Sequence, residues 1–268
     1  MFRFLKLAAR YRLLSKNWWL FYYLDFFRKK IVYKNLEIAF SNLPKKEKIK
    51  IAKNTYKNFA TFFEDIILYN TNKKLFDNIK IENEEYFLNA LKSKKPIILL
   101  GAHFGNWEIS SKFLYHKYKI PLAGVMREIK ENKAFNKFLK EIRGNSDIKL
   151  IDKRNSAKEI LKALLKEKRV VGILIDQYTK GKNPVKLTFF KETVFNPAIS
   201  KLAKTTKAIV IPFFLYKEKN NYVAYFSKPK EFTENDTIES FTKWQAKEIE
   251  NIIKKYPDQY YWFHNRWK

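Results

Sequence analysis

The sequence predicts an α/β layered fold with a largely parallel central sheet flanked by helices, preceded by an N-terminal amphipathic helical region. Three observations support this prediction. From residue 96 onward, short apolar runs alternate with segments of helical periodicity. Residues 46–69 carry apolar side chains three and four positions apart, as a long amphipathic helix does. All 6 glycines lie between residues 101 and 181, so sharp turns and close backbone approaches are expected there.

Residues 1–33 mix basic side chains with aliphatic and aromatic ones. Their best apolar run, residues 18–24, is shorter than the ~20 residues that a membrane-spanning helix needs, and Asp25 ends it. The basic start has no uninterrupted apolar core, so the pattern does not predict a secretory signal. We expect a membrane-associating helical segment that lies in the interface of an anionic membrane. An amphipathic helix packed on the protein's own core is the alternative.

Residues 34–268 are expected to form a single domain. After the helix at 46–69, a short strand at 79–81 and a helix at 84–91 are predicted. The alternating part then gives strands at residues 97–101, 121–126, 148–151, 170–175 and 208–215. Helices are predicted between them at residues 133–143, 156–166 and 196–205. A further strand near residues 220–228 and a helix at 238–255 complete the prediction.

The bulk composition limits the chemistry. With no cysteine, disulfides, thiolate metal sites and a cysteine nucleophile are excluded, and 3 unclustered histidines disfavour a zinc site. We therefore expect neither a metal nor a cofactor. The 55 Lys and Arg against 27 Asp and Glu give a net charge of +28, which attracts anions such as acidic lipids, an acidic carrier protein or nucleic acid. A lysine-rich compositional drift accounts for the charge equally well, and no motif of nucleic-acid recognition accompanies it.

A histidine follows the strand at 97–101 directly, at the edge of the sheet where α/β folds place their sites. Asn106 is suited to the N-cap of the next helix, which puts Glu108 in its first turn. Gly105 gives the loop the freedom to fold the imidazole of His103 back towards Glu108. A carboxylate on one ring nitrogen leaves the other free to take a proton from an alcohol. The spacing alone is common, so it leaves a purely structural role open.

The residues around this pair carry a more specific pattern. "GAHFGNWE" (101–108) resembles the signature of the late acyltransferases of lipid A biosynthesis, which are distant relatives of the glycerolipid acyltransferases. "NLEIAFSNLPKKEKIKIA" (35–52), "GVMRE" (124–128), "GILIDQ" (172–177), "VFNPAISKLAKTTKAIVIPFF" (194–214) and "YPDQYYWFHNRWK" (256–268) resemble further family motifs in the same order. The chain departs from them at Asn196 and Asn265, and its N-terminal apolar stretch is shorter than the family's usual membrane helix.

The resemblance implies a glycerolipid-acyltransferase-like fold in residues 34–268 and acyl transfer from an acyl-acyl carrier protein to a hydroxyl of a lipid A precursor, the secondary acylation of lipopolysaccharide biosynthesis. It implies that His103 acts as general base and that Glu108 orients it. Arg127 would stabilise the oxyanion or bind an acceptor phosphate, with a surface or structural role as the alternative. Asn106, Asp176 and Gln177 are expected at the same edge of the sheet, where structural roles stay open for them.

Partners and location follow from the same resemblance. We expect the acyl carrier protein, the lipid A precursor and an anionic membrane surface as partners, with no nucleic acid. The expected place is the cytoplasmic face of the cell inner membrane, with peripheral or shallow anchoring. A glycerophospholipid or another glycolipid is the alternative acceptor. His116 is predicted to be a surface residue of a helix, and His264 to pack the C-terminal segment against the body.

Overall fold

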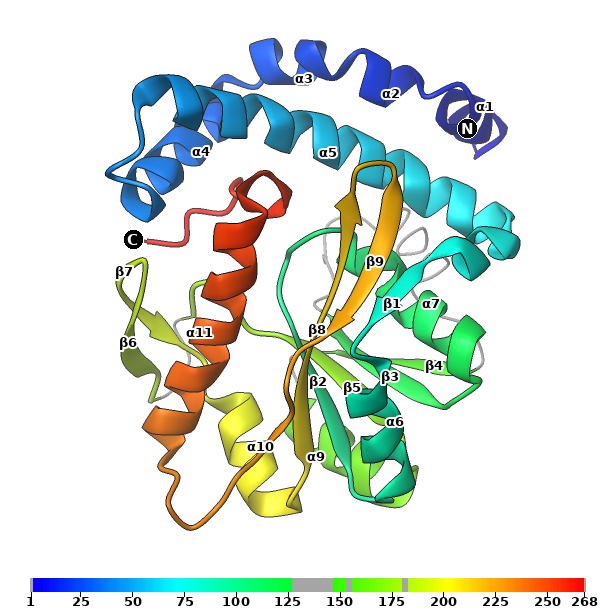
Figure 1. Cartoon of the computed structure of the whole chain (residues 1–268), viewed down its shortest axis with the longest axis vertical. Coiled ribbons are helices and arrows are strands. Elements are labelled where there is room, and N and C mark those ends of the chain that lie inside the picture. Colours follow the sequence, from blue (N-terminus) through cyan, green and yellow to red (C-terminus); the bar gives the residue numbers. More distant parts are fainter. Residues whose placement is uncertain (1, 127–146, 153–155, 180–182, 268) are drawn as a thin grey trace.

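A mixed sheet runs through the centre of the molecule (Figure 1). The computed structural model describes residues 2–126, 147–152, 156–179 and 183–267. Within these ranges the sheet has 8 strands. They are β1 (Lys80–Glu82), β2 (Ile97–Gly101), β3 (Leu122–Met126), β4 (Ile148–Asp152), β5 (Val170–Leu174), β8 (Ile209–Glu218), β9 (Asn221–Phe226) and β10 (Lys230–Glu231).

The strand order is β1-β9-β8-β2-β5-β3-β4, with β10 paired to β8. The five strands β8, β2, β5, β3 and β4 are mutually parallel, whereas β9 and β10 run antiparallel to β8. This confirms the largely parallel central sheet. Because parallel neighbours share their carboxyl edge, the chain segments that follow β2 and β5 come out side by side.

Apolar layers cover both faces of the sheet, because helices pack on each side. One layer contains the inward side chains of α7 (Trp107–Tyr118) and α6 (Glu84–Lys92), among them Phe87, Ile109 and Phe113. The other contains residues of α9 (Ser156–Leu161), α10 (Ala198–Thr206) and α11 (Ile238–Lys255). A single π-helical stretch, Lys162–Lys166, continues α9. The predicted helices at 156–166 and 238–255 are therefore present.

Four N-terminal helices pack against one long helix that follows them in the chain. They are α1 (Phe2–Arg10), α2 (Leu13–Lys16), α3 (Trp18–Leu24) and α4 (Phe26–Ala39), followed by α5 (Lys45–Thr71). Figure 1 shows α1, α2 and α3 laid along α5, and all three contact it. The boundary expected after residue 33 falls inside α4, because this helix continues without a break.

The N-terminal helices bury one side and expose the other. Ala8, Ala9 and Tyr22 are buried against the body, and buried Glu64 of α5 accepts hydrogen bonds from the backbone N–H groups of Leu14 and Ser15. The outward side carries exposed large apolar residues. These are Leu7, Tyr11, Leu13, Trp19, Leu20, Phe21, Tyr23, Leu24, Phe26 and Phe27, which we call the N-terminal apolar face. In the part of the chain that the structure describes, no helix is both long and apolar enough to cross a membrane.

Two parts of the structure differ from the predicted elements. A separate antiparallel hairpin, β6 (Val185–Phe189) and β7 (Lys191–Phe195), lies where no strand was predicted. The helix predicted from residue 196 begins at Ala198, after Pro197. The helix predicted at 133–143 lies outside the described residues. A short 3₁₀ turn, Lys73–Asn78, joins α5 to β1, and another, Pro257–Gln259, follows α11.

Candidate active site

His103 lies two residues beyond β2, in the loop that leads to α7. The strand is completely buried, so it fixes the position of the loop in the middle of the sheet edge. The loop turns at Gly105, whose φ is +57° and where an added Cβ would lie 2.0 Å from the backbone oxygen of Leu215. Only glycine fits this turn, because a side chain would meet β8. About a fifth of the His103 side chain remains exposed (21%).

The carboxylate bonded to His103 is that of Asp176, which follows β5. Asp176 Oδ1 lies 2.8 Å from Nδ1 of the ring and also accepts the backbone N–H of His103 at 3.1 Å. The sheet order explains this pairing, because β5 is the direct neighbour of β2. Burial by itself raises the pKa of the Asp176 carboxyl, but the charge of His103 and the two hydrogen bonds outweigh burial and lower it. Asp176 is thus held as a carboxylate.

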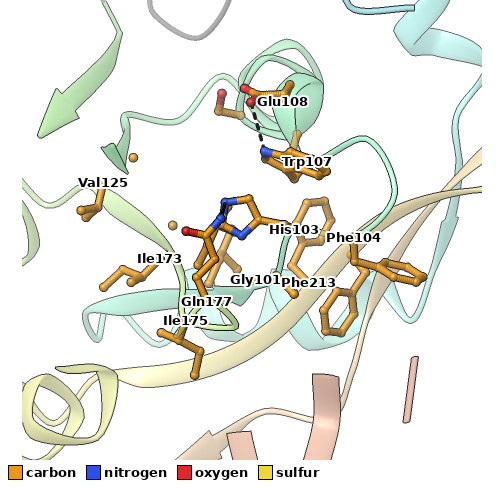
Figure 2. A pocket seen from close by; sticks show the side chains of 18 of the residues that line it. Gly101, His103, Phe104, Trp107, Glu108, Val125, Ile173, Ile175, Gln177 and Phe213 are labelled. Atoms are coloured by element: carbon orange, nitrogen blue, oxygen red, sulfur yellow. Dashed lines mark hydrogen bonds between the residues drawn. The ribbon is translucent and has the colours of Figure 1, made fainter. Parts of the chain in front are cut away.

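Glu108 was expected to hold the His103 ring, and the structure gives that contact to Asp176. Glu108 stands in the first turn of α7, where its Oε1 accepts the indole N–H of Trp107 at 3.1 Å. The Trp107 ring in turn meets the His103 ring edge-on, with centroids 5.1 Å apart. In Figure 2 the Trp107 side chain lies between those of Glu108 and His103. The physical reason is the start of α7 at Trp107, which carries Glu108 onto the helix and away from the ring.

Gln177 approaches the other nitrogen of the ring. Its amide nitrogen lies 3.2 Å from Nε2 of His103. A carboxylate accepts hydrogen bonds only, so Nδ1 carries the proton that points at Asp176, and Nε2 keeps a lone pair that the Gln177 amide can donate to. An acceptor hydroxyl that donates to Nε2 therefore has to replace this amide.

Asn106 occupies the N-cap position of α7, but its side chain makes no capping hydrogen bond. Its amide instead donates to the backbone oxygen of Phe62 at 3.2 Å and to the hydroxyl of Tyr222 at 3.0 Å. The Tyr222 hydroxyl donates to buried Asp65 of α5 at 2.7 Å. Asn106 is 1% exposed and does not line the cavity. Its side chain connects the loop to α5 and β9 through these hydrogen bonds.

A cavity of about 730 Å³ opens in front of the His103 ring. His103, Glu108 and Gln177 contribute its polar wall at the sheet edge. Most of the remaining lining is apolar, and it extends between α7 and the strands as far as Leu122 and Ile148. The predicted site residues His103, Glu108, Asp176 and Gln177 are therefore brought together at one edge. Arg127 lies outside the described residues.

The C-terminal segment closes the back of the loop. The backbone N–H of Gly105 donates to the oxygen of Gln259 at 2.9 Å, and the N–H of Tyr261 donates to the oxygen of His103 at 2.9 Å. Tyr260 is fully buried behind Asp176; burial and the charge of Asp176 raise its pKa well above the ordinary value. From the sequence, no contact of this segment with the loop was expected, although five of its eight residues from Tyr256 to Phe263 are aromatic, which is typical of a buried segment.

The remaining histidines behave differently. His116 of α7 pairs with Asp77 at 2.7 Å on the surface, in agreement with the prediction of a surface helix residue. His264 lies on the cavity wall, and its predicted role in packing the C-terminal segment stays a prediction. Trp107, which the sequence did not single out, belongs to the site because it touches both His103 and Glu108.

Comparison with known proteins identifies the family. The model of the bacterial lipid A biosynthesis acyltransferases matches residues 1–268. The chain belongs to this family. It is 23% identical over 247 residues to the lipid A biosynthesis lauroyltransferase of Escherichia coli (strain K12), covering 90% of this chain and 79% of the relative.

Among solved structures, the chain matches the 1-acyl-sn-glycerophosphate (LPA) acyltransferase PlsC from Thermotoga maritima. It is 14% identical, the match covers 93% of this chain and 98% of that chain, and the TM-score is 0.45. As a member of the lipid A acyltransferase family, the protein is an acyltransferase of lipid A biosynthesis.

Proposed function

We propose that this lipid A acyltransferase takes its acyl group from an acyl-acyl carrier protein and adds it to a hydroxyl of an already acylated lipid A precursor, with His103 as general base. The observation that carries the proposal is the ring of His103, whose Nδ1 is held by buried Asp176 while Nε2 faces the cavity. This is the arrangement that activates a hydroxyl nucleophile.

In the proposed step the acceptor hydroxyl displaces the Gln177 amide and donates to Nε2. Its oxygen bonds to the thioester carbonyl carbon while Nε2 takes the hydroxyl proton. The tetrahedral intermediate then loses its carbon–sulfur bond, and the carrier-protein thiol leaves with the proton from His103. Asp176 stabilises the imidazolium between these two proton transfers.

Glu108 assists His103 through Trp107 in this proposal. Because the Glu108 carboxylate accepts the indole N–H, it fixes the Trp107 ring, and that ring limits the rotation of His103. Glu108 also lies on the cavity wall, where a carboxylate can accept a hydrogen bond from the sugar of the acceptor.

The surface charge supports the choice of donor and of location. A net charge of +28 favours an acidic carrier protein and the phosphates of the acceptor, and it attracts an anionic bilayer. The N-terminal apolar face supplies exposed aromatic side chains for the interface of that bilayer. We therefore place the protein peripherally on the cytoplasmic face of the inner membrane, held by its first helices.

The test is an acyl-transfer assay with purified protein, a series of acyl-acyl carrier proteins and a Kdo-bearing lipid A precursor. His103→Ala is expected to lower transfer by about 10²–10⁴-fold. His116→Ala is the matched control, because it removes a surface histidine of α7, and it is expected to keep full activity. Transfer that survives His103→Ala contradicts the mechanism. Transfer to lysophosphatidic acid but not to the lipid A precursor supports the glycerophospholipid alternative.

A further inference from the structure

Two glycines lie next to each other in the interior of the sheet. Gly124 of β3 and Gly172 of β5 are partners in register, with Leu150 of β4 and Leu99 of β2 on either side of the pair. Residues that pair in register point to the same face of a sheet. The row therefore reads leucine, glycine, glycine, leucine on the face that α7 covers.

Neither packing nor backbone geometry requires glycine at these two positions. Apart from the neighbouring residues in the chain, no atom of the described residues lies within 4 Å of a Cβ added to Gly124, and a Cβ on Gly172 meets only the backbone oxygen of Ala123 at 3.9 Å. The positive φ that requires glycine is found at Gly105, not at this pair. Glycine in a strand interior weakens the strand, and it often marks a place where a ligand comes close.

The open space above the pair belongs to the cavity of the active site. Both glycines line this cavity, together with Leu114 of α7 and Leu122 at the start of β3. Leu122 pairs with Val170, and Gly101 at the mouth pairs with Leu174, four residues further along β5. At ~3.3 Å per strand residue, the apolar channel is thus roughly 13 Å deep from the level of Gly101 to that of Leu122. Its midpoint is the glycine pair.

We infer that Gly124 and Gly172 keep the acyl-chain channel open at half its depth and thereby determine the length of chain that the enzyme transfers. This inference rests on the proposed function, and it adds the residues that set donor specificity. A side chain at either position fills the channel at half its depth. The thioester of a short chain still reaches His103, whereas the end of a long chain then has no room.

Gly124→Leu, Gly124→Ala and Gly172→Ala are tested with saturated acyl-acyl carrier proteins whose chains lengthen by two carbons at a time. We expect Gly124→Leu to transfer the shorter chains at nearly the wild-type rate and to lose at least about tenfold in kcat/KM for the longest chain that the wild type uses. The alanine variants should show the same trend with a smaller loss. The short donor serves as the internal control, since it reports on folding and on the chemical step in each variant.

Thr188→Leu is the matched control, because it adds the same side chain to an exposed strand position of β6 outside the cavity. Its chain-length profile is expected to equal that of the wild type. An unchanged profile in Gly124→Leu overturns the inference, as does an equal loss for all donors in a Gly124→Ala variant that melts at the wild-type temperature.

A second measurement separates this inference from the proposed function. Saturated fatty acids of the same lengths are titrated against wild type and variants, with tryptophan fluorescence as the readout, since Trp107 lines the cavity. If no donor supports transfer by the wild type, the proposed function fails. Weaker binding of only the long fatty acids to Gly124→Leu would still support the channel, and equal binding of all lengths to both proteins would overturn it.

Discussion

At the scale of single residues, the proposed mechanism depends most on the pairing of His103 with Asp176. The two groups come from neighbouring strands, and Asp176 is 1% exposed. In that mechanism the buried carboxylate has two tasks: it selects the tautomer with a proton on Nδ1, and it balances the positive charge that His103 would acquire on taking the proton of the acceptor. It is a positioning residue, because it acts through the ring.

Asp176→Asn should therefore lower acyl transfer by about 10²–10⁴-fold, since the amide can donate to Nδ1 and stabilise the wrong tautomer. The pH profile of kcat should change in the same variant. Asp236→Asn makes the same exchange at an aspartate that does not line the cavity and is bonded to Lys230, and it should leave transfer unchanged. If Asp176→Asn kept full activity and Glu108→Gln were inactive, Glu108 and not Asp176 would be the carboxylate that supports the His103 ring.

The lowered pKa of Asp176 also affects stability. A carboxyl whose pKa is lower in the folded than in the unfolded chain stabilises the fold above its ordinary pKa of about 4, and this contribution is lost as the pH falls through the folded value. On acidification below about pH 4, the wild type should thus lose more free energy of unfolding than Asp176→Asn. Denaturant titrations at a series of pH values measure this difference, and parallel curves would contradict it.

At the scale of elements, the loop between β2 and α7 depends on one glycine. Gly105→Ala is expected to cost roughly 3 kcal/mol or more in unfolding free energy, because its Cβ would overlap the backbone of Leu215 and its φ is positive. Gly101→Ala is the matched comparison. There an added Cβ meets the end of the flexible Leu174 side chain at 2.6 Å, so the cost should be about 1 kcal/mol. Equal denaturant midpoints for the two variants would refute this argument.

The strands and helices of the parallel sheet were predictable because each has a local pattern. Strand 97–101 and helix 238–255 agree with the structure to the residue. The hairpin of β6 and β7 was not predicted because its turn lacks the usual residues: Phe190 takes a φ of +58° where glycine or asparagine is typical. A sequence pattern for hairpins relies on those residues, so this one gave no local signal.

The sequence predicted which residues form the site, but it did not predict which carboxylate bonds to His103. His103, Glu108 and the Asp176–Gln177 pair were all expected at the carboxyl edge, since each follows or begins an element there. The strand order β2-β5-β3 decides which carboxylate reaches His103, and this order is set by long-range packing. Sequence distance favoured Glu108, which is five positions from His103, whereas Asp176 lies 73 positions away.

At the scale of the whole molecule, the N-terminal helices have two different sides. Their inner side is attached to α5 by an ion pair of Arg12 with buried Asp65 at 2.5 Å and by the bonds to Glu64. Their outer side exposes Leu24, Phe26 and Phe27 to 70%, 65% and 87%. Large apolar side chains in such a group mark a binding surface. The inner side thus packs on the protein's own core, which was the alternative weighed for this segment, and the membrane-associating role stays a prediction for the outer side.

The triple variant Leu24→Ser, Phe26→Ser, Phe27→Ser should bind vesicles of phosphatidylglycerol and phosphatidylethanolamine at least about tenfold more weakly than the wild type, since each buried side chain contributes about 1.5–3 kcal/mol. Sedimentation with the vesicles measures the binding, which should weaken further with added salt. Leu88→Ser with Leu165→Ser removes exposed leucines elsewhere and is the control. Equal binding of the triple variant and the wild type would show that this face does not contact lipid.

The strap formed by Gln259 and Tyr261 has a consequence for the time at which the enzyme becomes active. The loop that bonds to it is synthesised far earlier, before most of the sheet and all of α11. At roughly 5–20 residues per second, the two sides of these bonds leave the ribosome on the order of ten seconds apart. Until then the backbone oxygen of His103 and the backbone N–H of Gly105 lack these partners. A nascent chain can thus settle its first helices and most of its sheet while the loop that carries His103 still lacks these two hydrogen bonds, and under the proposed mechanism acyl transfer begins only after they form.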